Sequence, residues 1–404
     1  MDMGDGITGR RARRRWAMLC LGFLCILAFA VMMQYVPPVL SLVMAEFQLS
    51  YAQGGLLMSL FALPGIMLSI PIGMLADRYS QKLIVVVLFV IMIAGAAMFA
   101  SGNSFPILGL GRVVSGIGAR GFSVIVPLFL AQWFARREMG IAMGVFHAGM
   151  PLGIILSLNI LSLLGENLGW QASAWSSVGF SLVVLLIFVF LFSAAPRTNQ
   201  HISPRSFGFL QDMRQAGAQI WLVGAAWMLF GATFISLITF TPDFLQASGF
   251  SIASAGFLTS LVMWPQLVLG PIVGYVLDKM GRKRTIIAVG GLTSAILVLL
   301  IPIASQWILV LMLLIGVAMS LIPVPIFALP SEITSPEKLG VAFGVLATCN
   351  NLGIVIGPAT AGFIRDVTGS YQASYALMAG FALMIMFMMI ILNLRHNPEL
   401  PMIH

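Results

Sequence analysis

Two arginines lie within one apolar stretch of the chain, where a positive charge has few polar neighbours along the sequence. Arg112 and Arg120 are eight residues apart, about two turns of an α-helix, so a helix places them on a similar face. A guanidinium can donate two parallel hydrogen bonds to the oxygens of a carboxylate, nitrate or phosphate group. The pair therefore predicts a binding site for a small anion.

Other polar and aromatic residues in apolar stretches are candidates to line the same site. An amide can donate to an anion without adding a charge, and an aromatic ring can form a wall of the site. Both kinds of residue also join helices to one another, so packing is the alternative for each of them. The candidates are Gln34, Tyr35, Trp264, Gln266 and Asn350.

The composition places most of the chain in lipid. Of the 404 residues, 60% are hydrophobic and 8% are charged, whereas about a quarter of the residues of a soluble domain are charged. A helix needs roughly twenty apolar residues to cross the hydrocarbon layer. We therefore expect an all-α membrane protein with about twelve transmembrane helices. The expected spans are residues 16–40, 52–77, 82–102, 106–132, 139–163, 170–194, 217–242, 252–277, 284–304, 307–330, 338–364 and 371–394.

The ends and the loops indicate how these spans are arranged. The apolar run after Arg15 is longer than a signal-peptide core of roughly 7–15 residues, so it predicts a retained first helix. Basic residues gather in alternate loops, which predicts that both termini are cytoplasmic, in a bacterial inner membrane. The expected parts are a basic N-terminus (1–15), an N-terminal bundle (16–194), a cytoplasmic linker (195–216), a C-terminal bundle (217–394) and a tail (395–404).

Several features repeat about 200 residues apart. The matched positions are Gly73, Asp77 and Arg78 with Gly274, Asp278 and Lys279, and Gly140, Gly144 and Gly153 with Gly340, Gly344 and Gly353. Such a repeat predicts a duplicated helical bundle. Because many duplicated membrane proteins bind a substrate at the junction of their halves, the repeat also favours a transporter.

With these motifs placed, the chain resembles the major facilitator superfamily over essentially its whole length. The loop motif of that family reads G-x-L-a-D-r-x-G-r-k; the first copy departs from it at Ser80 and Gln81, and the second copy fits it better. The resemblance implies two pseudo-symmetric six-helix bundles and a conformational latch formed by the two loops. The latch residues would be Gly73, Asp77, Arg78, Gly274, Asp278, Gly281 and Arg282.

The same resemblance bears on the two arginines. The stretch Arg112-Val-Val-Ser-Gly116 is similar to the fourth-helix motif of the family, in which the arginine often holds backbone carbonyls or a neighbouring helix. Arg112 can therefore be structural or contact a substrate. The stretch from Gly111 to Gly144 also resembles members that carry organic or inorganic anions. Arg120 is predicted to contact the anion; the alternative is that it faces a water-filled cavity and sets its potential.

Coupling to protons is the less favoured mechanism. The apolar spans contain no Asp or Glu, unless Asp77, Asp243 or Asp278 reaches in from a span end. His147 is the intramembrane group that titrates near neutral pH, and it is either a proton carrier or a hydrogen-bonded core residue. Uniport or anion exchange needs no titrating group and fits better.

The leading hypothesis is a monomeric carrier that moves a small organic or inorganic anion by alternating access. Efflux of hydrophobic compounds is the alternative, and a non-transporting receptor on the same scaffold also remains open. The sequence shows no nucleophile and base pair, metal cluster, cofactor fingerprint or sign of nucleic-acid binding, so we expect no enzyme activity and no cofactor. Cys20, Cys25 and Cys349 are expected to be packing residues.

Overall fold

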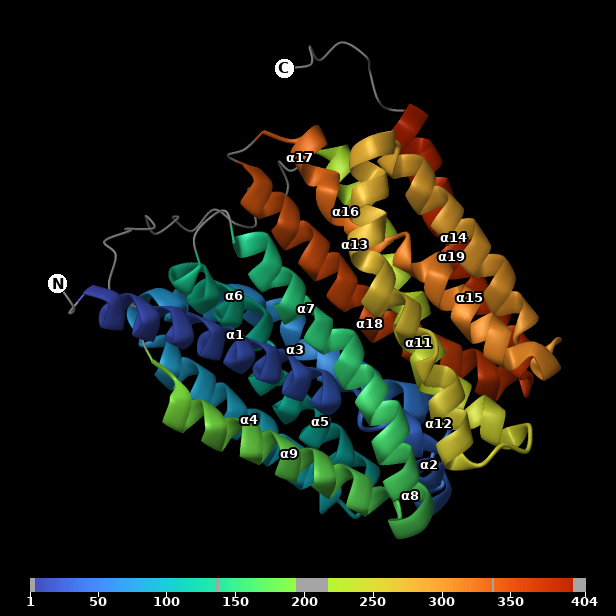
Figure 1. Cartoon of the computed structure of the whole chain (residues 1–404). Helices are drawn as coiled ribbons and strands as arrows, with labels where there is room; N and C mark the ends of the chain where they lie inside the picture. The colour runs from blue at the N-terminus through green and yellow to red at the C-terminus, as the bar shows by residue number, and fades with distance from the viewer. Residues whose placement is uncertain (1–3, 135–137, 194–216, 336–337, 395–404) are drawn as a thin grey trace. The chain divides into compact units, whose positions relative to one another are not determined.

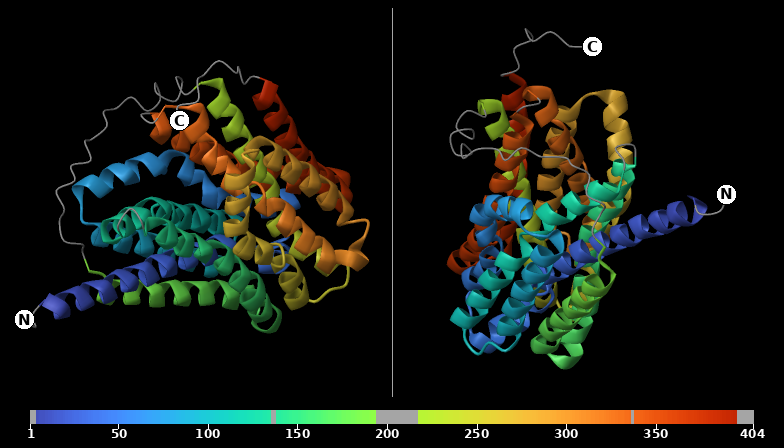
Figure 2. Two further views of the ribbon diagram at one scale, coloured as in Figure 1. Left: turned by 45° about the horizontal axis from the view of Figure 1, so that its top comes forward. Right: turned by 90° about the vertical axis from the view of Figure 1, so that its left-hand side faces the viewer.

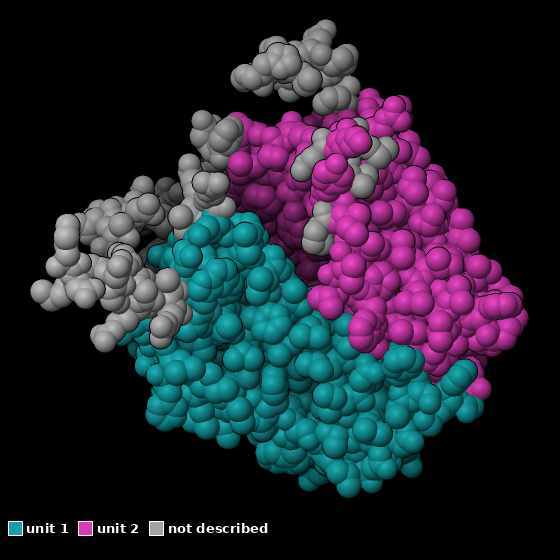
Figure 3. Space-filling model, in the orientation of Figure 1, with its two compact units in different colours: residues 1–49, 60–203, 249–257 teal, residues 50–59, 204–248, 258–404 magenta. Residues whose placement is uncertain are grey.

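The computed structural model describes residues 4–134, 138–193, 217–335 and 338–394, and these residues form helices joined by short connections (Figure 1). No strand occurs in the described ranges, which confirms the all-α prediction. The chain divides into two compact units (Figure 3). Unit 1 comprises residues 1–49, 60–203 and 249–257, and unit 2 comprises residues 50–59, 204–248 and 258–404.

Unit 1 is formed mainly by the helices of the N-terminal half. The first turns of its first helix, α1, project beyond the other helices of the unit (Figure 2). The elements are α1 (Gly4–Gln34), the 3-10 turn η1 (Pro37–Val39), α2 (Leu40–Phe47), α3 (Tyr51–Arg78), α4 (Gln81–Ala100), α5 (Phe105–Ala119), α6 (Phe122–Trp133), α7 (Met139–Leu156), the π-helical turn η2 (Ser157–Leu161), α8 (Ser162–Leu168) and α9 (Trp170–Leu191).

Unit 2 is formed mainly by the helices of the C-terminal half. Its elements are α11 (Ala218–Ala247), α12 (Ile252–Ser260), α13 (Met263–Met280), α14 (Lys283–Leu300), the 3-10 turn η3 (Ser305–Trp307), α15 (Ile308–Ser320), α16 (Pro323–Ala328), α17 (Pro330–Ile333), α18 (Leu339–Thr368) and α19 (Tyr371–Leu394). Two helices are divided between the units: α3 begins in unit 2, and α12 begins in unit 1.

Eleven segments of the described chain are long and apolar enough to cross a membrane, and each overlaps one predicted span. The predicted span 106–132 comprises two helices, α5 and α6, which are joined by a turn at Arg120 and Gly121 whose backbone keeps helical dihedral angles. Glycine is a weak helix former, and Gly116, Gly118 and Gly121 cluster at this point. Pro127 also removes one backbone donor from α6.

Both units use the same helix pairings, which confirms the duplicated bundle. Helix α1 packs against α7 as α11 packs against α18, and α4 packs against α5 and α9 as α14 packs against α15 and α19. Two matched glycines lie where these helices come closest. A Cβ on Gly153 would overlap Ala30 of α1, and a Cβ on Gly353 would overlap the carbonyl of Met228 in α11. Small residues of this kind let membrane helices approach closely.

Candidate functional site

Helix α1 ends at Gln34 because two prolines follow it closely. Pro37 and Pro38 have no N–H, so neither can donate to the carbonyl four residues earlier, on Met33 and Gln34 respectively. The last carbonyls of a helix need other partners when they are buried. Buried residues surround this helix end, so the partners must come from the protein.

Arg112 of α5 supplies donors to this helix end. Its Nη1 donates to the carbonyl of Met32 and its Nη2 to the carbonyl of Met33, each at 3.0 Å. The guanidinium carbon lies 5.0 Å from the ring centroid of Tyr35 and 4.5 Å from that of Phe61. The side chain is fully buried, and its positive charge complements the partial negative charge of a helix C-terminus. Of the two roles left open by the sequence, these bonds support the structural one.

Arg120 lies at the turn between α5 and α6. It is buried, with 8% of its surface exposed. Its guanidinium carbon is 6.0 Å from the ring centroid of Phe61, the ring that Arg112 also contacts. The two arginines therefore reach the same side chain of α3, in accordance with their helical spacing.

The side chain of Arg120 extends over Gly65 of α3. A Cβ built on Gly65 would lie 2.6 Å from both Cδ and Nε of Arg120. The position of the guanidinium thus depends on the absence of a side chain at residue 65. Neither Phe61 nor Gly65 is distinguished in the sequence from the other apolar residues of the span.

Gln34 and Tyr35 lie at the end of α1, directly after the carbonyls that Arg112 binds. Gln34 is fully buried, and neither its Oε1 nor its Nε2 has a hydrogen-bond partner among the described residues. A buried amide without partners is costly, and such groups are typical of places where water or a ligand binds. Tyr35 is also fully buried, and its ring packs edge-on against Phe99 at 5.1 Å between centroids.

Three predicted site residues belong to unit 2 and are described within it. Trp264 is about half exposed, at 47%. The Nε2 of Gln266 donates to the carbonyl of Val262, the residue directly before α13, at 3.3 Å, so this amide is bonded to the backbone one turn earlier. The Oδ1 of Asn350 in α18 lies against Gly231 of α11.

His147, the predicted titrating group, is exposed on α7. Its ring lies 5.0 Å from that of the adjacent Phe146. Among the cysteines, Cys25 and Cys349 are buried in accordance with a packing role, whereas Cys20 is exposed.

The two copies of the loop motif connect their helices in different ways. Gly281 adopts a left-handed φ of 64° directly after α13, a conformation that glycine accepts without strain. In the first copy, the Oγ of Ser80 caps α4 by accepting from the N–H of Leu83 at 3.3 Å. Arg282 precedes α14 and is exposed. Four predicted latch residues lie where the structure does not describe side chains: Gly73, Asp77, Arg78 and Asp278. A Cβ built on Gly274 would meet no other atom within 4 Å.

Asp243 is one of the three carboxylates that the sequence left open as reaching into an apolar span from its end, and the structure places it within a helix. Helix α11 continues through this residue to Ala247, and Asp243 is 6% exposed. The hydroxyl of Tyr371 in α19 donates to its Oδ2 at 2.7 Å, which explains why a carboxylate is tolerated there. One turn later in α19, the hydroxyl of Tyr375 donates to Thr241 at 3.1 Å. Tyr371 and Tyr375 are one helical turn apart and therefore lie on one face of α19. This spacing is the signal in the sequence that could have indicated a contact with a polar residue of another helix.

Comparison with known proteins identifies relatives over most of the chain. A family model described as the Major Facilitator Superfamily matches residues 18–257 and 222–401. A lysosomal dipeptide transporter from Danio rerio is 24% identical over 87% of this chain and 81% of its own length. A probable sulfoacetate transporter from Cupriavidus necator is 24% identical over 89% of this chain and 90% of its own length. The crystal structure of the nucleoside transporter NupG has a similar fold, with a TM-score of 0.79 at 15% identity, covering 93% of this chain and 99% of that one.

Proposed function

Since this chain belongs to the major facilitator superfamily, we propose that it carries a small organic or inorganic anion across the membrane by alternating access. Arg120 binds the anion in this proposal. Arg112 holds the end of α1, and Gln34 donates a further hydrogen bond to the cargo. The carrier is a monomer with both termini in the cytoplasm.

The observation that carries the proposal is the burial of Arg120 at the turn between two apolar helices, α5 and α6. A charged side chain within the bilayer is costly, and such residues often mark the pathway of a substrate or an ion. Arg120 is such a residue, because 8% of its surface is exposed and apolar helices precede and follow it.

The amide of Gln34 supports the proposal from a second helix. Its donor and acceptor are both buried without partners among the described residues. A bound cargo with an oxygen atom could accept from Nε2 and remove the cost of the unpaired donor. Gln34 thereby adds a neutral hydrogen bond to the charged one from Arg120.

The relatives support an anionic or carboxylate-bearing cargo. Sulfoacetate carries a sulfonate and a carboxylate, and a dipeptide carries a carboxylate at its C-terminus. A guanidinium can bind the paired oxygens of either group in a bidentate manner. The chemistry shared by these two cargoes is therefore the chemistry that Arg120 recognises.

Thermal unfolding of the purified protein with small ligands tests the proposal. A ligand that binds only the folded state adds about 2.7 kcal/mol of stability at a hundred times its dissociation constant. We expect at least one of sulfoacetate, acetate, nitrate and dialanine to raise the Tm of the natural protein. In Arg120→Gln this shift should disappear, whereas in Arg120→Lys, which keeps the charge but loses the planar fork, it should shrink.

Arg14→Gln is the matched control, because it removes a positive charge at an exposed position of α1. This variant should respond to the ligand as the natural protein does. An equal shift in Arg120→Gln would contradict the assigned role, and so would uptake into proteoliposomes at the natural rate. If hydrophobic cations or neutral compounds stabilise the protein while anions do not, efflux is the correct function.

A further inference from the structure

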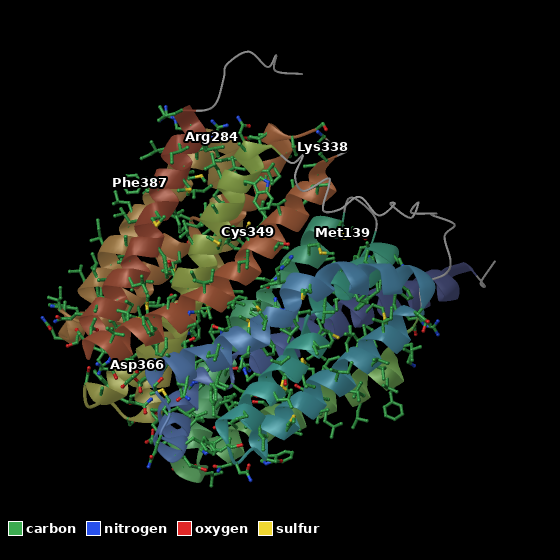
Figure 4. All side chains as sticks on the ribbon, turned by 180° about the vertical axis from the view of Figure 1, so that it is seen from behind. Met139, Arg284, Lys338, Cys349, Asp366 and Phe387 are labelled. Atoms are coloured by element: carbon green, nitrogen blue, oxygen red, sulfur yellow. The ribbon has the colours of Figure 1, made fainter. Side chains whose placement is uncertain are left out.

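Helices α1 and α7 pack along each other within unit 1, and α7 begins at Met139 (Figure 4). Glycines of α7 lie against α1. A Cβ built on Gly149 would lie 2.5 Å from Cγ2 of Ile26. A Cβ built on Gly153 would lie 2.5 Å from Cβ of Ala30. The contact therefore repeats four residues later in both helices, about one helical turn, so the two helices run in the same direction.

The next pair in this series is Gln34 and Ser157, four residues further along each helix. Gln34 is the last residue of α1, and Ser157 follows α7 with helical dihedral angles. The π-helical turn η2, which begins at Ser157, packs against both α1 and η1. The two polar side chains are therefore placed at one level of the contact between α1 and α7.

Both side chains of this pair are fully buried, and neither has a hydrogen-bond partner among the described residues. The unpaired atoms are Nε2 and Oε1 of Gln34 and Oγ of Ser157. Other buried serines, such as Ser162 and Ser236, donate to the carbonyl four residues earlier, at 2.6 and 2.7 Å. Because an unpaired buried polar group is costly, the pair is suited to a ligand that bonds both side chains.

The unpaired atoms define which chemical group fits between them. Nε2 is a donor, Oε1 is an acceptor, and the serine hydroxyl both donates and accepts. The oxygens of a carboxylate, nitrate or sulfonate group only accept, so they cannot satisfy Oε1. A cation would be repelled by Arg112, whose Nη2 donates to the carbonyl of Met33, the residue before Gln34. An uncharged hydroxyl both donates and accepts, and it meets no repulsion.

The pair adjoins the candidate anion site within unit 1. Arg112, which bonds the backbone directly before Gln34, has its guanidinium carbon 4.5 Å from the ring centroid of Phe61. Arg120 reaches the same ring from 6.0 Å. The end of α1 and Arg120 are thus linked through one aromatic side chain. This arrangement suits a cargo whose charged group and hydroxyl group are separated by a carbon chain.

We propose that Gln34 and Ser157 form a subsite for an uncharged hydroxyl group of the cargo. The cargo hydroxyl donates to Oε1 of Gln34 and accepts from Oγ of Ser157, while Nε2 of Gln34 donates to another oxygen of the cargo. The subsite rests on the proposed anion site at Arg120. It narrows the cargo from small anions in general to hydroxylated organic anions.

Thermal unfolding of the purified protein with matched pairs of acids tests the subsite. The members of each pair differ by one hydroxyl, and the pairs vary the distance between this hydroxyl and the carboxylate. The pairs are glycolate and acetate, β-hydroxypropionate and propionate, and γ-hydroxybutyrate and butyrate. Tm shifts at several concentrations give the affinity of each acid. In at least one pair the hydroxylated acid should bind about 2- to 12-fold more tightly, the range for a single net hydrogen bond.

Two variants with matched chemistry show whether Ser157 causes this preference. Ser157→Ala removes the hydroxyl of the subsite, so the two acids of the pair should bind equally. Ser177→Ala is the control, because Ser177 is also buried but donates to the carbonyl of Ser173 at 3.1 Å. This variant should keep the preference. A preference that survives Ser157→Ala, or that disappears equally in Ser177→Ala, would overturn the subsite.

The ligands also separate the subsite from the carrier function. If acids bind but both members of every pair bind equally, the subsite is wrong and the anion site at Arg120 stands. If no anion of any kind raises the Tm, the carrier function fails and the subsite with it. If Ser157→Ala lowers the Tm of the ligand-free protein and leaves the preference unchanged, an ordered water bonds the two side chains and the subsite is wrong.

Discussion

Removal of Arg112 should destabilise the protein without removing its binding site for the cargo. In Arg112→Met, the carbonyls of Met32 and Met33 lose both bonds from the guanidinium. Hydrogen bonds to charged groups contribute about 1.5–3 kcal/mol each in soluble proteins, which gives about 3–6 kcal/mol for the pair. Side-chain bonds measured in membranes average about 0.6 kcal/mol and reach about 1.7 kcal/mol, which gives about 1–3 kcal/mol. We expect a loss of about 3 kcal/mol, where the two ranges meet.

Equilibrium unfolding in detergent, with increasing denaturant, measures this loss. Arg112→Lys keeps the charge at the helix end but lacks the fork that reaches both carbonyls, so it should lose about half as much. Pro37→Ala restores an N–H that can donate to the carbonyl of Met33, as in a continuous helix. The cost of Arg112→Met should therefore fall by about 1 kcal/mol in the Pro37→Ala background. A loss below about 1 kcal/mol, or no coupling to Pro37, would refute the capping role.

Two glycines give further predictions. Gly65→Ala places a methyl group against Cδ and Nε of Arg120; displacing this side chain from its rotamer costs about 0.5–1.5 kcal/mol, so the affinity for an anion, measured by titration, should fall about two- to tenfold. Gly353→Ala forces a methyl group against the carbonyl of Met228, and the resulting overpacking should lower the free energy of unfolding by about 1–3 kcal/mol. Gly179 of α9 has open space around it, so Gly179→Ala should change neither quantity by as much. If all three variants changed the anion affinity and the free energy of unfolding equally, the close contacts at Gly65 and Gly353 would not determine either quantity.

The membrane spans are predictable because each depends on a local property, a run of about twenty apolar residues. The repeat is predictable because the glycines at the close approach of two helices recur in both halves, as Gly153 and Gly353 do. The turn at Arg120 is not predictable from hydropathy, since the apolar run continues through it on both sides. Hydropathy measures the average environment of a segment, and it does not detect a turn between two apolar helices.

Roles that depend on distant partners are also beyond a local reading of the sequence. Arg112 is structural because of carbonyls that lie about 80 residues earlier, and Asp243 is buried because of Tyr371, which is 128 residues later. The sequence identifies each of these side chains as unusual. It cannot distinguish a group that awaits a ligand from one that already has a partner in another helix.

Arg112 bonds the carbonyls at the end of α1, and this limits the negative charge that a cargo can carry. Its charge faces the partial negative charge of that helix end, so it attracts a ligand less strongly than the presence of two arginines in the sequence suggests. A doubly charged ion would bring into the lipid interior a second negative charge that Arg120 alone does not neutralise. We therefore expect a singly charged ligand such as acetate to raise the Tm more than the doubly charged sulfoacetate at equal concentration, and selection by charge would act in addition to selection by shape.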